Sequence, residues 1–197
     1  MLQGSDLAAF RGDRLIFEGV SFSLSPGGAL VLEGENGAGK TSLLRLLAGF
    51  LPLAAGQLFW EGADAFADRV AHGRRIGWLG HQDAIKPGLS VAENLDPWNH
   101  AGKAAPAVAL AAVGLADFAE VPGRMLSAGQ RRRVAICRLL LADAPLWLLD
   151  EPTTALDRAS ITRLGRLLAA HRAQGGLVIA ATHLDLPLPD AARLTLG

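Results

Sequence analysis

The chain has 197 residues, and its 19 Lys and Arg residues balance its 19 Asp and Glu residues. This length suits one domain, and a neutral chain lacks the basic field that non-specific nucleic-acid binding needs. Hydrophobic residues make up 50% of the chain, yet no uninterrupted apolar run reaches the ~18 residues of a membrane-spanning helix. The single cysteine, Cys137, excludes an internal disulfide, and residues 1–14 lack the basic start and apolar run of a signal peptide.

The first part of the chain contains short apolar segments separated by glycine-rich turns. Residues 20–24 alternate apolar and polar side chains, which predicts a half-buried strand. Residues 29–33 form a continuous apolar run, which favours a buried strand, and residues 57–60 and 76–79 indicate two more strands. Leucines at helical spacing predict a helix over residues 40–50.

The middle of the chain, residues 83–141, is rich in Ala and Leu and has few β-branched residues in series. Capping-box patterns at Ser90 and Ser127 predict that helices begin there. Residues 104–113 form a further expected helix. This region therefore resembles a helical insertion between two sheet-forming parts.

After the helical region, the pattern returns to strands and helices in alternation. We expect a strand at residues 146–150, a helix at 157–172 and a strand at 177–182. Strands that alternate with helices indicate an α/β fold with a mainly parallel sheet.

A glycine-rich loop follows the predicted strand at 29–33. Its sequence, G-E-N-G-A-G-K-T, fits the phosphate-loop pattern G-x-x-x-x-G-K-[ST] and lies between a strand and a helix, as that motif requires. Backbone N–H groups of such a loop surround phosphates, the lysine reaches the outer phosphates, and the Thr hydroxyl faces Mg²⁺. The residues expected to surround the phosphates of a nucleotide here are Gly34, Glu35, Asn36, Gly37, Ala38, Gly39, Lys40, Thr41 and Ser42.

Two carboxylates, Asp150 and Glu151, end the apolar run L-W-L-L. Open parallel sheets bind ligands at the carboxyl edge of their strands. We expect Asp150 to hold Mg²⁺, directly or through water, and Glu151 to act as the general base toward the attacking water.

Four further features occur in the order found in one family. Residues 126–130, L-S-A-G-Q, closely resemble the signature of ATP-binding-cassette (ABC) ATPases, a class of P-loop NTPase. Gln82 resembles the glutamine of the family's Q-loop, residues 155–157 resemble its D-loop, and His183 resembles its switch histidine. The resemblance implies one nucleotide-binding domain over 1–197, with an N-terminal antiparallel β portion. Its implied parts are a catalytic core of 1–82 and 142–197 and a helical subdomain of 83–141.

The resemblance also implies how the site works. Two chains would form a head-to-tail homodimer around two ATP molecules, with Asp157 acting across the interface. Gln82 would sense Mg²⁺ and the lytic water, and His183 would contact the γ-phosphate. The residues expected to face the partner's nucleotide are Ser127, Ala128, Gly129 and Gln130.

Three features depart from the family pattern or leave alternatives open. Ala128 replaces the usual glycine but keeps its N–H donor. The chain has no Tyr, and the position that usually stacks on adenine holds Arg11, with Phe10 beside it. Arg11 either stacks on the base or is a solvated charge. The arginines at 131–133 are expected to form a solvated face of the signature helix, with some dipole or interface pairing.

Residues 78–86, W-L-G-H-Q-D-A-I-K, and the alanine variant of the signature resemble the bacterial cytochrome c maturation ATPases of the haem exporter type. This resemblance implies ATP and Mg²⁺ as cofactors and separate integral membrane subunits that dock on the helical subdomain. It places the chain peripherally at the cytoplasmic face of the bacterial inner membrane, in haem export or release of haem from a periplasmic chaperone. We expect no haem bound by this chain and no nucleic-acid partner. Another small-substrate ABC transporter, or a non-transport ABC protein, remains as an alternative.

Overall fold

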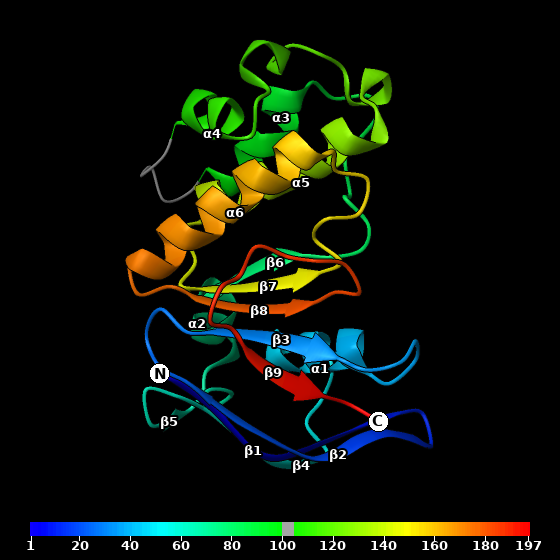
Figure 1. Cartoon of the computed structure of the whole chain (residues 1–197), viewed down its shortest axis with the longest axis vertical. Helices are drawn as coiled ribbons and strands as arrows, with labels where there is room; N and C mark the ends of the chain where they lie inside the picture. Colours follow the sequence, from blue (N-terminus) through cyan, green and yellow to red (C-terminus); the bar gives the residue numbers. More distant parts are fainter. Residues whose placement is uncertain (100–104) are drawn as a thin grey trace.

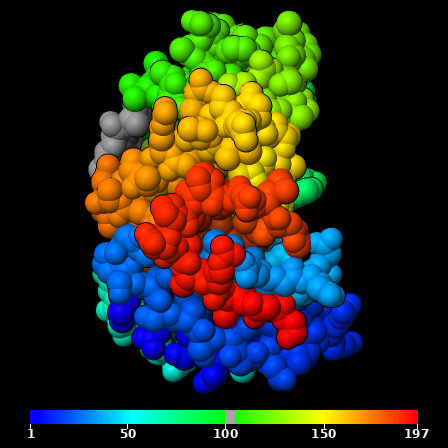
Figure 2. All heavy atoms as spheres, in the orientation of Figure 1, coloured from blue at the N-terminus to red at the C-terminus, as the bar shows by residue number. Residues whose placement is uncertain are grey.

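The computed structural model describes residues 1–99 and 105–197. Their strands form two sheets, and the helices between β6 (Ile76–Leu79) and β7 (Leu146–Asp150) lie at the opposite end of the molecule from the antiparallel sheet (Figure 1). In the space-filling view, the C-terminal segment, in red, lies across the face between the blue N-terminal part and the orange and yellow helices (Figure 2).

The central sheet is parallel, as the sequence predicts, and its strand order is β6-β7-β8-β3-β9. Three of the predicted strands have the expected bounds, and β8 ends one residue before the expected position. The short C-terminal strand β9 was not predicted, because it has only four residues and no continuous apolar run. The strands are β3 (Ala29–Glu33), β6 (Ile76–Leu79), β7 (Leu146–Asp150), β8 (Leu177–Ala181) and β9 (Ala192–Thr195).

The second sheet is antiparallel, with the order β2-β1-β4-β5. This confirms the N-terminal antiparallel portion that the family resemblance implies. Sequence periodicity missed β1 because register shifts interrupt its pairing, and Asp6, with φ of 48°, breaks the alternation of side chains. Strand β2 begins six residues before the predicted residue 20. The strands are β1 (Leu2–Arg11), β2 (Arg14–Leu24), β4 (Ala55–Trp60) and β5 (Ala63–Asp64).

Helices α1, α5 and α6 pack against the parallel sheet, α3 and α4 pack against α5, and short 3₁₀ turns connect several of the helices. Helix α1 ends before the predicted residue 50 because Gly49 adopts a φ of 78°, which turns the chain. Both capping boxes are confirmed, at Ser90 and Ser127, whereas α2 was not predicted. Residue 104, the predicted start of the helix seen as α4, lies outside the described residues. The α-helices are α1 (Lys40–Leu47), α2 (Arg69–Arg74), α3 (Val91–Leu95), α4 (Pro106–Ala112), α5 (Ala128–Ala142) and α6 (Arg158–Ala173). The 3₁₀ turns are η1 (Asp96–Trp98), η2 (Ala116–Phe118) and η3 (Gly123–Met125).

Alternate residues of the parallel strands feed two hydrophobic cores, one on each face of the sheet. In β7, Leu146 and Leu148 pack with α1 and the antiparallel sheet, whereas Trp147 and Leu149 pack with α5 and α6. This explains why the strand reads as a continuous apolar run. The sheet is therefore held from both faces, and the loops at its carboxyl edge have a fixed base. No helix within residues 1–99 and 105–197 combines the length and apolarity needed to cross a bilayer.

Two histidines, His72, which is buried, and His171, which is half-buried, make stability depend on pH. Burial lowers the pKa of His72, whose Nε2 lies 2.8 Å from the Leu47 carbonyl, and burial also lowers the pKa of His171, which stacks on Trp147. A depressed histidine pKa favours the neutral form in the folded chain, so this contribution is complete above the unfolded pKa of about 6.5 and is lost as pH falls below it.

We expect the midpoint temperature of thermal unfolding to decrease as the pH is lowered from about 7.5 to about 5.5. Ordinary carboxylates stay ionised over this pH range. Scanning calorimetry in buffers of equal ionic strength measures the midpoint. The His72→Gln variant removes one titrating group and should show a shallower fall. A midpoint that rises toward acid would contradict the burial of neutral imidazoles.

Candidate functional site

The loop between β3 and α1 begins and ends with glycines that the fold requires. Gly34 has a φ of 136°, and a Cβ there would overlap the carbonyl of Leu196, which follows β9. Gly39 precedes α1 with a φ of 100°, and a Cβ there would lie 2.8 Å from the Ile16 side chain. The two sheets therefore approach the loop so closely that only glycine fits at its ends. The loop leads directly into the N-terminus of α1, where the first N–H groups lack intrahelical acceptors, as in an anion site.

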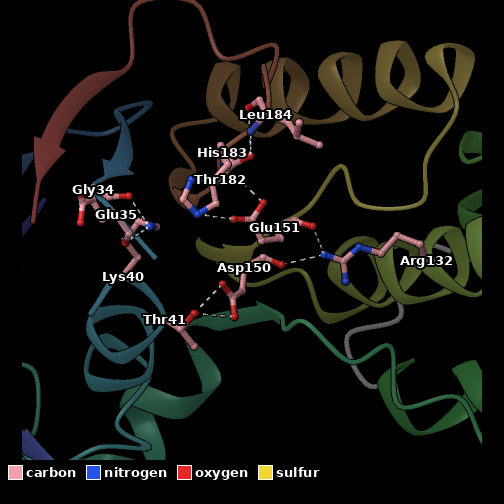
Figure 3. A network of polar contacts seen from close by, with 10 residues as sticks. All are labelled: Gly34, Glu35, Lys40, Thr41, Arg132, Asp150, Glu151, Thr182, His183 and Leu184. Carbon is pink, nitrogen blue, oxygen red and sulfur yellow. Dashed lines mark hydrogen bonds and ion pairs between the residues drawn. The ribbon is translucent and has the colours of Figure 1, made fainter. Parts of the chain in front are cut away.

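Lys40, the first residue of α1, is only 7% exposed. Its Nζ donates to the carbonyls of Gly34 and Glu35 at 2.7 and 2.9 Å (Figure 3). Two of the three N–H groups of the ammonium thus hold it against the loop. A buried cation fixed in this way provides charge for a phosphate without free movement of its side chain.

The Thr41 hydroxyl meets Asp150 at the end of β7. The Thr41 Oγ1 lies 3.0 and 3.1 Å from the two carboxylate oxygens of Asp150, which is 4% exposed (Figure 3). These residues are 109 positions apart, and the parallel sheet brings them together. A hydroxyl and a carboxylate are hard oxygen donors of the kind Mg²⁺ takes in addition to substrate phosphates. The donor set therefore fits Mg²⁺.

Glu151 follows Asp150 and has a φ of 48°, a conformation that L-residues rarely adopt. Its Oε2 accepts from the His183 backbone N–H at 3.4 Å, and its Oε1 lies 3.8 Å from His183 Nε2 (Figure 3). The Thr182 hydroxyl accepts from the Leu184 N–H at 3.0 Å, which shapes the turn after β8. The structure thus brings the expected base and the expected switch histidine together beside the loop.

A cleft of about 1030 Å³ contains most of the predicted site. It is lined by predicted residues from β1, α1, β7 and the loops beside them, and also by residues that the sequence did not identify, of which Arg14 and Arg45 add positive charge. Arg11 lies on it, and Phe10, which is 46% exposed, does not contribute. The predicted residues in its lining are Arg11, Asn36, Gly37, Gly39, Lys40, Thr41, Ser42, Gln82, Asp150, Glu151 and His183.

The signature segment does not line this cleft, but its own geometry is well defined. Ser127 Oγ accepts from the Gln130 N–H at 3.2 Å, and Gln130 Oε1 accepts from the Ser127 N–H at 2.7 Å. This capping box occupies the Gln130 side chain and leaves the Ala128 and Gly129 N–H groups at the helix start without intrahelical acceptors. Gly129 has no room for a side chain, because a Cβ would lie 2.7 Å from the Ala155 carbonyl.

Asp157 has a local structural role in addition to any role across an interface. Its side chain caps α6 by accepting from the Ser160 N–H at 2.7 Å. Hydrogen bonds from Ser160 lower the pKa of this carboxyl, so it is ionised at neutral pH. A hydrogen-bonded anion therefore stands at the N-terminus of α6, where the helix dipole favours it.

The expectation of a solvated arginine face at 131–133 is wrong for Arg132. This side chain is 2% exposed and lies among backbone carbonyls near Glu151. The burial of Arg132 cannot be recognised from a run of three identical residues. Helix geometry turns one of three consecutive residues toward the sheet. Arg131 and Arg133 instead bond to carbonyls of the helical region, those of Leu126 and of residues 113 and 114.

Comparison with known proteins agrees with this geometry. The model of the ABC transporter family matches residues 17–154. A relative from Paramagnetospirillum magneticum, named cytochrome c biogenesis ATP-binding export protein CcmA, is 56% identical over 97% of this chain and 91% of its own length. The protein of the same name from Rhodospirillum rubrum is 57% identical over 98% and 84%.

Solved structures show the same fold. A dimeric ATP-binding cassette in a post-hydrolysis state, bound to ADP and Pi, has a TM-score of 0.81 and 23% identity over 93% of this chain and 88% of that one. A bacterial Atm1-family ABC exporter with ATP bound has a TM-score of 0.87 and 25% identity over 100% of this chain and 36% of that one.

Proposed function

Because this chain belongs to the ABC transporter family, and within it to the cytochrome c biogenesis ATP-binding export proteins, we propose that it is the ATP-hydrolysing subunit of a membrane complex that serves cytochrome c maturation. The observation that carries the catalytic part is the convergence of Lys40, Thr41, Asp150 and Glu151 at one cleft. As an ABC ATPase, the chain converts ATP and water to ADP and phosphate.

Lys40 and the loop N–H groups hold the β- and γ-phosphates of ATP, and Arg11, which lines the same cleft, stacks on the base. Thr41, Asp150 and Gln82 are the residues that would hold Mg²⁺. When bound, Mg²⁺ neutralises charge that develops on the phosphate oxygens. His183 contacts the γ-phosphate beside Glu151.

Glu151 acts on the water that attacks the γ-phosphorus. Its carboxylate accepts one proton from the water, the water oxygen bonds to phosphorus, and the bond to the oxygen bridging the β- and γ-phosphates breaks. The electron pair of that bond stays on ADP. The His183 N–H, 3.4 Å from Glu151 Oε2, orients the carboxylate. General-base catalysis of this kind contributes about 10²–10⁴-fold.

The site is completed by a second copy of the chain. Ser127, Ala128 and Gly129 stand outside the cleft of their own chain, and the start of α5 offers N–H donors that suit a γ-phosphate. Two chains packed head to tail place this helix start over the partner's Lys40. Asp157 joins the same interface, next to the Gly129–Ala155 contact.

The complex works on the export of haem, or on its release from a periplasmic chaperone, and this chain binds neither haem nor nucleic acid. Residues 83–141 form a helical subdomain on which integral membrane subunits dock, and 1–82 with 142–197 form the catalytic core. The chain thus lies peripherally at the cytoplasmic face of the bacterial inner membrane. The names of the relatives support the cytochrome c assignment.

Complementation tests this assignment against another small-substrate ABC transporter. In a bacterium deleted for its own CcmA protein, expression of this chain is expected to restore c-type cytochromes, measured by reduced-minus-oxidised absorbance spectra. The Lys40→Ala variant, expressed to the same level, should not. If the chain hydrolyses ATP and joins the membrane fraction but c-type cytochromes stay absent, the cytochrome c role is contradicted and the other transporter class is favoured.

A further inference from the structure

The buried guanidinium of Arg132 is surrounded by oxygen atoms from two loops. The side chain reaches from α5 to the end of β7, as Figure 3 shows, and it also contacts the segment after β6. Its three nitrogens all donate hydrogen bonds, although the whole residue is 2% exposed. The acceptors are Asp150 O at 2.8 Å, Glu151 O at 2.6 Å, Pro152 O at 3.3 Å, Gly80 O at 2.6 Å and Asp83 Oδ1 at 3.0 Å.

The hydrogen bonds that Arg132 makes at the end of β7 lie on both sides of Glu151. The Nη2 of Arg132 donates both to the carbonyl before Glu151 and to the carbonyl of Glu151 itself. The Glu151 N–H in turn donates to the Ala181 carbonyl at 2.8 Å. The peptide groups on both sides of Glu151 are therefore tied to neighbouring elements.

These ties hold Glu151 in a backbone conformation that its own sterics disfavour. With φ of 48°, Glu151 lies in the left-handed region, which a non-glycine residue occupies only when the surroundings fix it. Rotation to an ordinary φ would turn its carbonyl away from Arg132 and its side chain away from His183. The direction of the catalytic carboxylate thus depends on the hydrogen bonds of its backbone.

The second set of contacts fixes the guanidinium itself. Its Nη1 bonds to Gly80 and to the carboxylate of Asp83, on either side of Gln82. Arg138, from the same helix, donates to the carbonyls of Asp83 and Ala84 at 2.7 and 3.0 Å. The planar fork of arginine, with five donors, can serve both loops at once, which a lysine ammonium cannot do.

We propose that Arg132 is a positioning residue for ATP hydrolysis, which holds Glu151 in its left-handed conformation so that the carboxylate faces the attacking water. This role rests on the proposed function of Glu151 as general base. In this proposal, α5 positions Glu151 of its own chain through Arg132. This role is separate from the contact that the N-terminus of α5 makes with the nucleotide of a partner chain.

Steady-state kinetics of purified variants test the proposal. Arg132→Lys keeps the positive charge but loses the fork, and we expect its kcat to fall about 100-fold because the base is misplaced. KM for ATP and the Kd for a fluorescent ATP analogue, measured with Mg²⁺, should change by less than about threefold, since Lys40 and the loop are untouched. Arg132→Met should lower kcat at least as much.

The matched control is Arg172→Met. The Arg172 guanidinium also joins two loops through backbone carbonyls, those of Gly27 and Pro189, both at 2.8 Å, but it lies away from the cleft. It is expected to lose stability without losing kcat per folded molecule, which circular dichroism and active-site titration quantify. A purely structural Arg132 would behave in the same way.

The possible results distinguish a failure of the proposed ATPase function from a failure of the positioning role of Arg132. No Mg²⁺-dependent ATP hydrolysis by the wild-type chain would remove the proposed function itself. An active wild type with Arg132→Lys within about twofold of its kcat, or with KM raised in proportion, would overturn the positioning role alone. If neither Arg132 variant folds while Arg172→Met does, Arg132 is required for the fold and the positioning role is likewise overturned.

Discussion

Glu151→Gln is expected to reduce ATP hydrolysis by about 10²–10⁴-fold, the contribution of a general base, while ATP binding persists. Glutamine has nearly the same shape, and its amide oxygen can still accept the His183 N–H that now bonds to Glu151 at 3.4 Å. It cannot take up the proton of the attacking water. Phosphate release measures the loss, and binding of a fluorescent ATP analogue measures what remains.

The same variant should accumulate as a dimer when ATP is added, because nucleotide enters the interface and is not hydrolysed. Size-exclusion chromatography with light scattering detects this dimer. The control is Glu18→Gln, an equal change of charge at an exposed position of β2 outside the cleft, which should keep the wild-type rate. Turnover by Glu151→Gln at the wild-type rate would show that another group accepts the proton.

Ser127→Arg is expected to abolish hydrolysis while the isolated chain still binds ATP with nearly unchanged affinity. Ser127 is exposed and lies outside the cleft of its own chain, so an arginine there leaves Lys40 and its loop intact. A bulky cation would block the helix start from a partner's γ-phosphate. We expect a loss of more than about 100-fold in phosphate release, since the catalytic constellation is not assembled.

Loss of the helix cap is a separate effect of this substitution and costs only about 1 kcal/mol. Ser90→Ala removes the other capping box, at the start of α3, and serves as the control: it should keep hydrolysis. A Ser127→Arg chain whose ATP affinity as a monomer falls in step with its activity would contradict the role across the interface.

Mixing two inactive chains tests the head-to-tail arrangement. A mixed dimer of Lys40→Ala and Ser127→Arg contains one site in which both defects meet and one site in which neither is present. The mixture should therefore regain ATP hydrolysis that each variant alone lacks. A mixture as inactive as its components would contradict a site shared in this manner.

The strands that carry the candidate site could be predicted because their sequence patterns lie within a few consecutive residues. The apolar run of β7 and the glycine loop before α1 have the sequence patterns that their geometry demands, and parallel pairing then brings Thr41 and Asp150 together. Strand β1 could not be predicted, since its irregular pairing and Asp6 interrupt the alternation on which such predictions depend.

Arg132 escaped prediction for another physical reason. Its acceptors are mostly backbone carbonyls, which every residue carries, so no sequence pattern indicates the contact. The sequence does not indicate the left-handed conformation of Glu151 either, because Glu has no preference for it. The expected role of Ser127 toward a partner chain rests on the family resemblance. Contacts between two chains cannot be seen in the structure of one chain.

The most direct measurement is haem staining of c-type cytochromes in cells whose only copy of the gene encodes the Lys40→Ala chain. Apocytochromes that are exported normally but lack covalent haem are the expected result, because the variant chain cannot bind ATP productively. Immunodetection of the apoproteins in the periplasm separates this from a secretion defect. Normal haem staining, with the variant protein present and its ATP hydrolysis abolished, would contradict the role in cytochrome c maturation.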